Sequence, residues 1–272
     1  VIAVLQRSSL GVAGVDAAER FAVSASTLST LAVLQIIVYA AMQVPVGVVL
    51  DRVGPKALIV TGSALLGAGQ ITIGIAPEFS VAVLGRVLVG MGDAMIFISV
   101  IRLLTNWFSG RVLPQLSQWT GNVGQLGQLL SALPFAWALH GIGWTWSFAV
   151  AGALSLIALI VVLLLVADAA PDAPAIHRAG SLREAGRSVV EAMRRPGTRL
   201  GFWSHYVTQS SGTAFALLWG TPALIGLGYS RGEAAAMLTL LVVSGVLSGP
   251  VLGILTARHP MRRSNLVLGI VV

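Results

Sequence analysis

The 272-residue sequence contains no cysteine and few charged residues. Without cysteine it has no disulfide framework, no thiolate metal site and no cysteine-based redox motif. Charged residues make up 10% of the chain, whereas a soluble domain carries about 25%, and so few charges cannot cover a water-exposed surface. The composition therefore excludes a disordered chain, a nucleic-acid-binding module and an ordinary soluble enzyme.

Long apolar runs take the place of the missing charge. Hydrophobic residues reach 56% of the chain, and the mean hydropathy is +0.88. Since about 20 apolar residues cross a bilayer as a helix, the runs predict a polytopic membrane protein. Residues 1–15 resemble the second half of a span and another span opens near Leu266, so both ends of the sequence are expected to lie inside spans. Between them the predicted spans are 28–50, 57–76, 80–104, 118–139, 145–167, 201–226 and 233–256.

The basic residues are distributed unevenly between the predicted loops. Thirteen fall on one side of the membrane, and only Arg20 and Arg231 fall on the other. Because cytoplasmic loops are enriched in Lys and Arg, we expect the long loop 168–199 to be cytoplasmic, with a surface helix over 181–195. The thirteen are Arg52, Lys56, Arg102, Arg111, Arg178, Arg183, Arg187, Arg194, Arg195, Arg199, Arg258, Arg262 and Arg263.

Two segments of the chain repeat each other at one offset. Gly47 and Gly253 are 206 residues apart, and so are Arg52 and Arg258. A parallel repeat at that distance indicates two six-span halves. We therefore expect a first bundle over 1–167, an inter-bundle loop over 168–199 and the start of a second bundle over 200–272.

The segment 47–56, Gly-Val-Val-Leu-Asp-Arg-Val-Gly-Pro-Lys, resembles the G-x-L-x-D-R-x-G-R/K-R/K loop signature of the major facilitator superfamily, with Pro55 in one basic position. Arg86-Val87-Leu88-Val89-Gly90 resembles the R-x-x-x-G of that family's fourth helix. The resemblance implies an all-α membrane fold: a six-helix bundle with a truncated first helix, and the first two to three helices of a second bundle. It also implies alternating access, with a substrate site between the bundles.

The same resemblance gives the loop signature a gating role. Its aspartate helps to lock the cytoplasmic gate in the family, and we expect Arg102 to be the partner of that aspartate here. The alternative is that Arg52 and Lys56 only anchor the topology. The residues assigned to the gate are Gly47, Asp51, Arg52, Gly54, Lys56 and Arg102.

Three charged residues fall well inside predicted spans: Arg7, Arg86 and Asp93. Each costs about 2.5–3.5 kcal/mol at a helix centre, so such residues face a bundle interior or a cavity. Arg86 and Asp93 are seven residues apart and share one helix face. Arg7 lies near mid-depth, and we expect it to face Asp93. The alternative is a purely structural Arg–Asp bridge.

The surroundings of these charges resemble the anion:cation symporter branch of the family. Arg7-Ser8-Ser9-Leu10 is similar to the start of that branch's first helix, and Gly90-Met91-Gly92-Asp93-Ala94 is similar to its G-x-G-E-A, with Asp for Glu. The resemblance implies that Arg7 binds a substrate carboxylate and that Asp93 carries a coupling proton. Arg86 is taken as a second substrate-binding residue.

Softer polar signals lie on two other spans. Gln125, on the span 118–139, either lines the cavity or bonds to another helix. His205, Tyr206 and Gln209 are candidates for a substrate wall. The alternative for the aromatic and histidine residues is the interfacial belt, because Arg199 is only six residues before His205.

The expected function is secondary active transport in the cell membrane, with proton-coupled uptake of a small organic anion. Alternatives are proton-coupled efflux of drugs or metabolites and a non-transporting membrane sensor. The sequence contains no P-loop and no H-E-x-x-H, so no ATP-driven step, metal site, cofactor or enzyme activity is expected. The expected partners are the substrate, protons and the bilayer, with no nucleic acid, and we expect a monomer.

Overall fold

A computed structural model describes residues 1–110, 112–169, 182–215 and 220–259, together with residues 262, 265 and 269. Every regular element within these ranges is a helix. The chain forms two compact units: the first comprises residues 1–109 and 123–185, and the second comprises residues 110–122 and 186–272. The predicted all-α fold is therefore confirmed. The predicted bundle boundaries at 167 and 200 stay a prediction.

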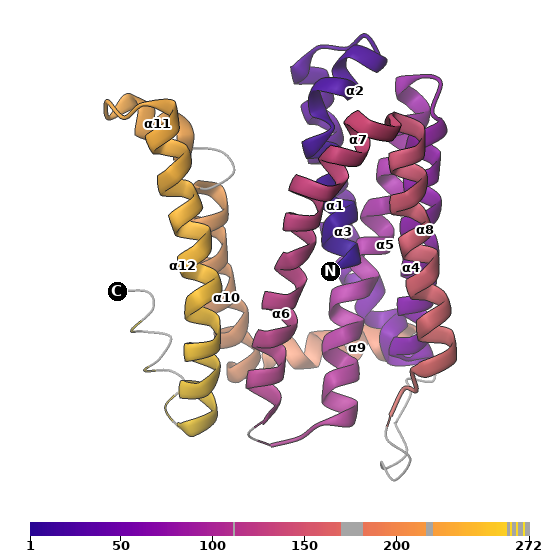
Figure 1. The fold of residues 1–272 in the computed structure, drawn as a ribbon. Helices are drawn as coiled ribbons and strands as arrows, with labels where there is room; N and C mark the ends of the chain where they lie inside the picture. Colours follow the sequence, from indigo (N-terminus) through magenta and orange to yellow (C-terminus); the bar gives the residue numbers. More distant parts are fainter. Residues whose placement is uncertain are drawn as a thin grey trace. The chain divides into compact units, whose positions relative to one another are not determined.

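Figure 1 labels the helices in chain order, and each can be assigned to one of the two units or to both. The first unit holds α1 (Ile2–Val12), α2 (Gly14–Arg20), α3 (Ala25–Val53), α4 (Pro55–Ile75), α5 (Phe79–Trp107) and α8 (Trp144–Leu165). The second holds α10 (Pro196–Ala214), α11 (Gly220–Gly226) and α12 (Arg231–Arg258). Two helices are shared between units: α6 (Val112–Leu130) and α9 (Leu182–Arg194). α6 continues into η1 (Ser131–Phe135) and α7 (Ala136–Ile142).

Five helices of the described chain are long and apolar enough to cross a membrane. They are Ser26–Val53, Pro55–Ile75, Phe79–Trp107, Trp144–Leu165 and Gly232–Arg258. They match the spans predicted at 28–50, 57–76, 80–104, 145–167 and 233–256. Those five predictions are confirmed, and the helix predicted at 181–195 is found as α9.

The other predicted spans have a more broken form. The span predicted at 118–139 lies within the continuous path of α6, η1 and α7, where a π-helical turn contains Pro134. A proline has no N–H to donate and its ring crowds the preceding turn, so a local change of helix type is expected there. The segment 201–226 is found as α10 and α11, and 216–219 lie outside the described residues. The span predicted from Leu266 also falls outside them, apart from residue 269.

The helix ends have local causes in the sequence. Gly54 has φ +91° and ψ 164°, a conformation that side chains other than glycine rarely adopt, and Pro55 then begins α4. Serine caps open α3 and α12, because the hydroxyls of Ser24 and Ser230 accept hydrogen bonds from the N–H groups three residues later. The two caps are 206 residues apart, which is the offset of the sequence repeat.

α4 packs closely against α5 and α8 in the first unit. Two pairs of glycines permit the close approach to α5. A Cβ on Gly69 would lie 2.7 Å from the carbonyl oxygen of Gly85, and one on Gly62 would lie 2.8 Å from that of Gly92. Small residues of this kind let membrane helices meet backbone to backbone. They hold α5, which carries two of the three membrane charges, in a fixed position.

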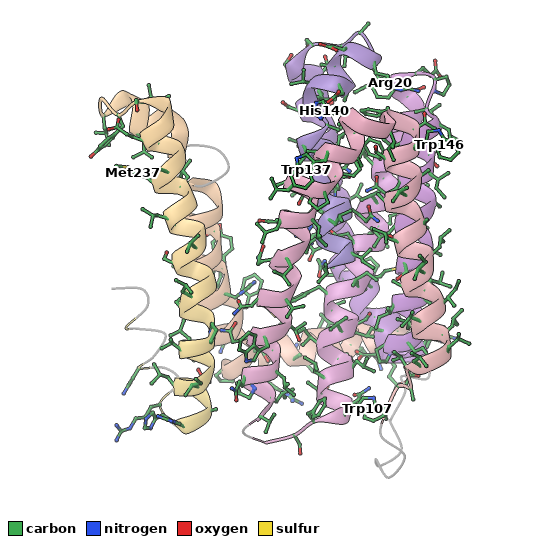
Figure 2. All side chains as sticks on the ribbon, in the orientation of Figure 1. Arg20, Trp107, Trp137, His140, Trp146 and Met237 are labelled. Atoms are coloured by element: carbon green, nitrogen blue, oxygen red, sulfur yellow. The ribbon has the colours of Figure 1, made fainter. Side chains whose placement is uncertain are left out.

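Polar and aromatic side chains mark the two ends of the first unit. Figure 2 shows Arg20, His140 and Trp146 at one end and Trp107 at the other. Arg20 donates to the carbonyl oxygen of Ala76 at 3.2 Å, and the indole N–H of Trp107 donates to that of Ala167 at 3.0 Å. Tryptophan and arginine at such positions are typical of the two membrane–water interfaces.

Candidate functional site

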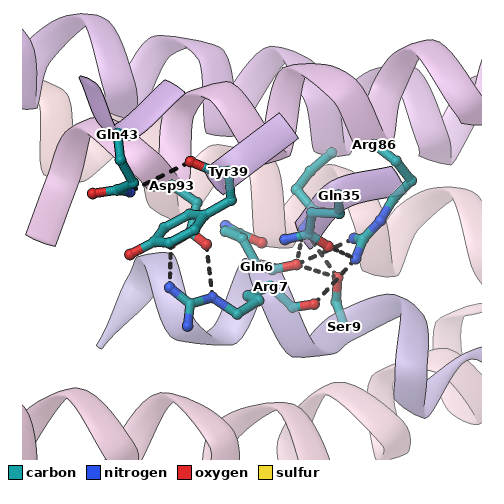
Figure 3. Close-up of polar contacts among 9 residues, drawn as sticks. Gln6, Arg7, Ser9, Gln35, Tyr39, Gln43, Arg86 and Asp93 are labelled. Carbon is teal, nitrogen blue, oxygen red and sulfur yellow. Dashed lines mark hydrogen bonds and ion pairs between the residues drawn. The ribbon is translucent and has the colours of Figure 1, made fainter. Parts of the chain in front are cut away.

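The three membrane charges meet where α1, α3 and α5 pack together (Figure 3). Arg7 forms a two-point ion pair with Asp93: Nε lies 2.6 Å from Oδ2 and Nη2 lies 3.0 Å from Oδ1. The two side chains differ in burial, since that of Arg7 is 45% exposed and that of Asp93 is 2% exposed. A guanidinium can grip a carboxylate in this parallel fashion, whereas a lysine ammonium cannot.

The aromatic ring of Tyr39 on α3 covers the guanidinium of Arg7. The distance from the guanidinium carbon to the ring centre is 5.0 Å, within the range of a cation–π contact. Gln43, one turn further along α3, donates to the main-chain oxygen of Tyr39 at 3.4 Å. Tyr39 thus provides an aromatic wall beside the exposed part of Arg7.

Arg86 is buried against α1, and its predicted role in substrate binding stays a prediction. Its residue is only 2% exposed. Its Nη2 donates to the main-chain oxygen of Arg7 at 3.1 Å, and its Nη1 lies 3.4 Å from that of Gln6. Nη2 also donates to Oε1 of Gln35. Arg86 therefore holds the backbone of α1 at the residue that carries the ion pair.

A buried network of amides and hydroxyls fixes α1 from its other side. Gln70 on α4 donates to the main-chain oxygen of Gln6 and to the hydroxyl of Ser9, each at 3.0 Å. Gln6 in turn donates to the main-chain oxygen of Ala151 at 2.5 Å and to the hydroxyl of Ser155 at 2.7 Å. Each of these bonds joins different helices, so the height and rotation of Arg7 are set by α4, α5 and α8 together.

Gln6, Gln35, Tyr39 and Gln70 are not among the site residues predicted from the sequence. The available signal was the presence of glutamine inside apolar runs, since a buried amide needs a partner. That signal gives no partner, because the bonded residues are between 51 and 149 positions apart in the chain.

The site carries a net positive charge. Arg7 and Arg86 contribute two positive charges and Asp93 one negative charge, so the sum is +1. The neighbouring side chains of Gln35, Tyr39 and Gln70 are neutral. Charges in a low-dielectric interior interact strongly, so this arrangement favours a bound anion. The described residues contain no group of three or more His, Asp or Glu that could hold a metal ion.

The gate signature lies at the far ends of α3 and α5. The guanidinium of Arg102 pairs with the carboxylate of Asp51, and both side chains are partly exposed. The expected pairing is thus present, while the gating role stays a prediction. Arg52 is exposed on α3, and a side chain at Gly47 would meet no neighbour within 4 Å.

The second half of the signature contacts Asp168, three positions after the end of α8, and Leu163 in the last turn of α8. The main-chain N–H of Lys56 donates to Oδ1 of Asp168 at 2.8 Å, and a Cβ on Gly54 would lie 2.8 Å from Oδ2 of the same carboxylate. The ammonium of Lys56 donates to the main-chain oxygen of Leu163 at 2.9 Å. Gly54 and Lys56 therefore have a structural task as well as any role in topology.

A family model described as Major Facilitator Superfamily matches residues 1–272. The chain belongs to the Major Facilitator Superfamily. It is accordingly a multi-pass membrane protein of a transporter family rather than an enzyme.

Three curated proteins are similar to part of this chain. It is 27% identical over 156 residues to the "Probable L-galactonate transporter" of Escherichia coli K12, which covers 57% of this chain and 34% of the relative. It is 26% identical to the "MFS-type transporter eupM" of Phoma sp, over 57% of this chain and 55% of the relative. It is also 26% identical to the "Probable sulfoacetate transporter SauU" of Cupriavidus necator, over 57% of this chain and 36% of the relative. The matched segments thus span between about a third and about half of these relatives.

The remaining predicted site residues lie on α6 and α10, outside the helices that carry the ion pair. Gln125 is exposed on α6. His205 and Tyr206 are exposed on α10 in the second unit, where the ring centres of Tyr206 and Trp203 are 5.9 Å apart. The side chain of Gln209 lies outside the described residues. At the 206-residue offset the counterpart of Arg7 is Thr213, so His205 and Tyr206 lie eight and seven residues before that position in the sequence. Their substrate role and the interfacial alternative both stay predictions.

Proposed function

We propose that the protein is a proton-coupled transporter that moves a small organic anion into the cell by alternating access. The observation that supports this is the ion pair between Arg7 and Asp93, with one partner half-exposed and the other buried. The exposed arginine offers a permanently charged fork to a substrate carboxylate. Asp93 is the carboxylate that this ligand displaces.

Displacement links the substrate to a proton. When a substrate carboxylate takes the fork of Arg7, Asp93 loses its partner in an interior that disfavours an unpaired charge. A proton then binds to a carboxylate oxygen of Asp93. The site holds +1 beforehand, from two arginines and Asp93, and +1 afterwards, from two arginines and the substrate. One carboxylate and one proton therefore enter the site without a change in its net charge.

Arg86 has a positioning role in this scheme. It is buried and bonds to the main chain of Gln6 and Arg7 rather than facing open space. Its second contribution is its positive charge. The oxygens of Gln6, Arg7 and Gln35 that accept its hydrogen bonds belong to main-chain carbonyls and an amide, so none of these three contacts neutralises that charge. Arg86 thus sets the place of Arg7 and keeps the site positive.

The names of two relatives support an anionic substrate. L-Galactonate carries a carboxylate, and sulfoacetate carries a carboxylate and a sulfonate, and both names belong to proteins that share about a quarter of the aligned residues with this chain. A site with a net charge of +1 and one exposed arginine suits ligands of this class. Sugar acids and small sulfonated acids are therefore the first substrates to examine.

We also propose that the pair of Asp51 and Arg102 belongs to the cytoplasmic gate and that residues 168–199 face the cytoplasm. The support is the basic excess on that side and the partial exposure of both gate residues. The chain has no cysteine, so a single cysteine introduced at Glu191 or at Tyr229 is the only thiol in residues 1–272. The proposed topology puts these two positions on opposite sides of the membrane. A membrane-impermeant thiol reagent added to intact cells should label only the cysteine at 229. Labelling of both positions from outside contradicts the orientation.

The decisive experiment uses the purified full-length protein in sealed proteoliposomes. With an acidic exterior, radiolabelled L-galactonate or sulfoacetate should accumulate above its outside concentration, and a protonophore should abolish the accumulation. A neutral sugar of the same size is the matched control and should not accumulate. Accumulation that ignores the pH gradient, or accumulation of the neutral sugar in preference to the acids, would rule out the proposal.

A further inference from the structure

The helix α9 separates its residues into an apolar and a charged side. At about 100° per residue, Val189, Val190 and Met193 fall within one arc of roughly 100°, and their exposed fractions are 36%, 55% and 41%. Glu184 and Glu191 lie about opposite the middle of that arc. A helix with such a division is typical of the membrane–water interface.

Three arginines occupy one flank between the apolar arc and the acidic row. Arg183, Arg187 and Arg194 lie within about 40° of one another at the same rotation per residue, and all three are exposed. Together with Arg195 and Arg199 they give five arginines against two glutamates in residues 182–199. The segment therefore carries a net charge of +3. Arginine placed beside an apolar face can rest its alkyl stem on lipid while its head meets phosphate.

The covalent connection keeps this helix close to the bilayer. α9 ends at Arg194 and α10 begins at Pro196, so a single residue joins them. The turn is closed by hydrogen bonds from the N–H of Arg195 to the oxygen of Ala192 at 3.0 Å and from that of Arg199 to the oxygen of Arg195 at 3.2 Å.

The start of α10 carries the residues of an interface. Phe202, Trp203 and Tyr206 have exposed fractions of 49%, 58% and 56%, and Arg199 precedes them by less than two turns. Aromatic and basic residues together are enriched at the headgroup level of membrane helices. The C-terminal end of α9 is therefore expected at the same level.

We propose that α9 lies in the plane of the bilayer surface and binds anionic phospholipid, with Val189, Val190 and Met193 against the acyl chains. The headgroup ligands are Arg183, Arg187 and Arg194. The acidic row of Glu184 and Glu191 then faces water, where it is not held against the anionic surface. This surface is separate from the ion pair of Arg7 and Asp93, and its occupant is a lipid rather than the transported solute.

The test uses spin labels on the full-length protein. One cysteine replaces Met193 on the apolar side, and a matched cysteine replaces Glu191 on the polar side of the same turn. Each labelled protein is reconstituted in phosphatidylcholine and in phosphatidylcholine with phosphatidylglycerol. Collisions with lipid-soluble oxygen and with a water-soluble nickel complex are then measured. Because both leaflets have the same composition, the measurement does not depend on the orientation of the protein.

The label at 193 should collide with oxygen and be shielded from nickel, the label at 191 should behave in the opposite way, and phosphatidylglycerol should increase the contrast. A variant with Arg183→Gln, Arg187→Gln and Arg194→Gln should lose the response to phosphatidylglycerol, with about fivefold weaker attraction for each arginine removed. Arg262→Gln, an exposed arginine outside this helix, is the control and should keep the response.

Three results overturn the proposal. In the first, the label at 193 is as accessible to nickel as the label at 191. In the second, the label at 193 is shielded from both probes, which would show that the apolar side packs on protein. In the third, the triple variant keeps the full response to phosphatidylglycerol. Uptake of the anion in the same proteoliposomes is measured separately. Failed transport with a normal lipid response contradicts the proposed function alone. Normal transport without a lipid response contradicts the lipid proposal alone.

Discussion

Asp168 caps the helix that begins at Pro55 by accepting the main-chain N–H of Lys56, although Asp168 and Lys56 are 112 positions apart. The carboxylate oxygen Oδ1 accepts the main-chain N–H of Lys56 at 2.8 Å, in the first turn of α4. The free N–H groups of a helix N-terminus favour a negative charge. The main-chain oxygen of Asp168 accepts a hydrogen bond from Asn106 at 2.9 Å, which also ties the end of α5 to this point. One residue thus joins the start of α4 and the end of α5 to the segment that follows α8.

Asp168→Ala should lower the free energy of unfolding by about 1 kcal/mol, the usual effect of removing a helix cap. Asp168→Asn keeps an oxygen that can accept the same hydrogen bond and should cost about half as much, since only the charge is lost. Thermal unfolding of the detergent-solubilised protein, followed by tryptophan fluorescence, measures both. Equal melting temperatures for the wild type and the alanine variant would show that Asp168 is not a cap in solution.

Two glycines of the gate signature should respond in opposite ways to alanine. Gly54→Ala places a side chain at φ +91° and within 2.8 Å of the Asp168 carboxylate, which should cost about 1–3 kcal/mol of stability. Gly47→Ala lies inside α3 with no neighbour near its Cβ position, so it should raise stability by about 0.5–1 kcal/mol. The same melting experiment compares them, and a stability loss at Gly47 equal to that at Gly54 contradicts the assignment.

Much of the fold could be predicted from the sequence because bilayer-spanning helices need long apolar runs. The end of α3 at Gly54 and the start of α4 at Pro55 follow from local chemistry. The opposition of Arg7 and Asp93 was also predictable, since charges at mid-depth need a partner. The helix ends depend on local backbone preferences, and the opposition of the two charges depends on depth and helical spacing.

Other features depend on contacts that the sequence does not specify. Arg86 shares the helix face of Asp93, as expected, but its guanidinium reaches the main chain of α1 instead of open space. The cap by Asp168 requires α4, α5 and α8 to be packed first. Tertiary packing decided the role of each of these residues.

Asp51→Asn should impair uptake while leaving expression and membrane insertion intact. The substitution keeps the shape of the side chain but removes the charge that pairs with Arg102, so the gate loses an ion pair that stabilises one state. Initial rates of anion uptake in proteoliposomes, normalised to inserted protein, should fall at least severalfold. Arg262→Gln, at an exposed position outside the signature, is the control and should keep the rate. An unchanged rate in Asp51→Asn would leave the segment with a topological role alone.

Gln35→Glu should separate the charge of the site from its geometry. Gln35 accepts a hydrogen bond from Arg86, and glutamate keeps that acceptor while reducing the net charge from +1 to zero. With an effective dielectric constant of about 20 and a separation of about 10 Å, one added charge weakens anion binding roughly tenfold. The KM for the anion should therefore rise by that factor while the melting temperature is maintained.

Gln35→Met is the matched control for that experiment. It removes the hydrogen bond without adding charge. It should lower the melting temperature, because Arg86 is left with a buried, unpaired donor, and it should leave the KM nearly unchanged. If glutamate and methionine raise the KM equally, the positive charge of the site has no part in substrate binding.

The coupling role of Asp93 is tested by separating exchange from accumulation. Asp93→Asn imitates the protonated carboxyl, so Arg7 is released and remains available to the substrate. The variant should bind the anion and exchange labelled for unlabelled anion across the membrane, but it should fail to concentrate the anion when the exterior is acidic. Arg7→Lys keeps the charge and loses the two-point grip, so it should weaken binding in both assays by about tenfold or more. Counterflow and pH-driven uptake are measured on the same proteoliposomes. If Asp93→Asn still accumulates the anion in response to the pH gradient, Asp93 does not carry the proton, and its pairing with Arg7 serves only to join α1 to α5.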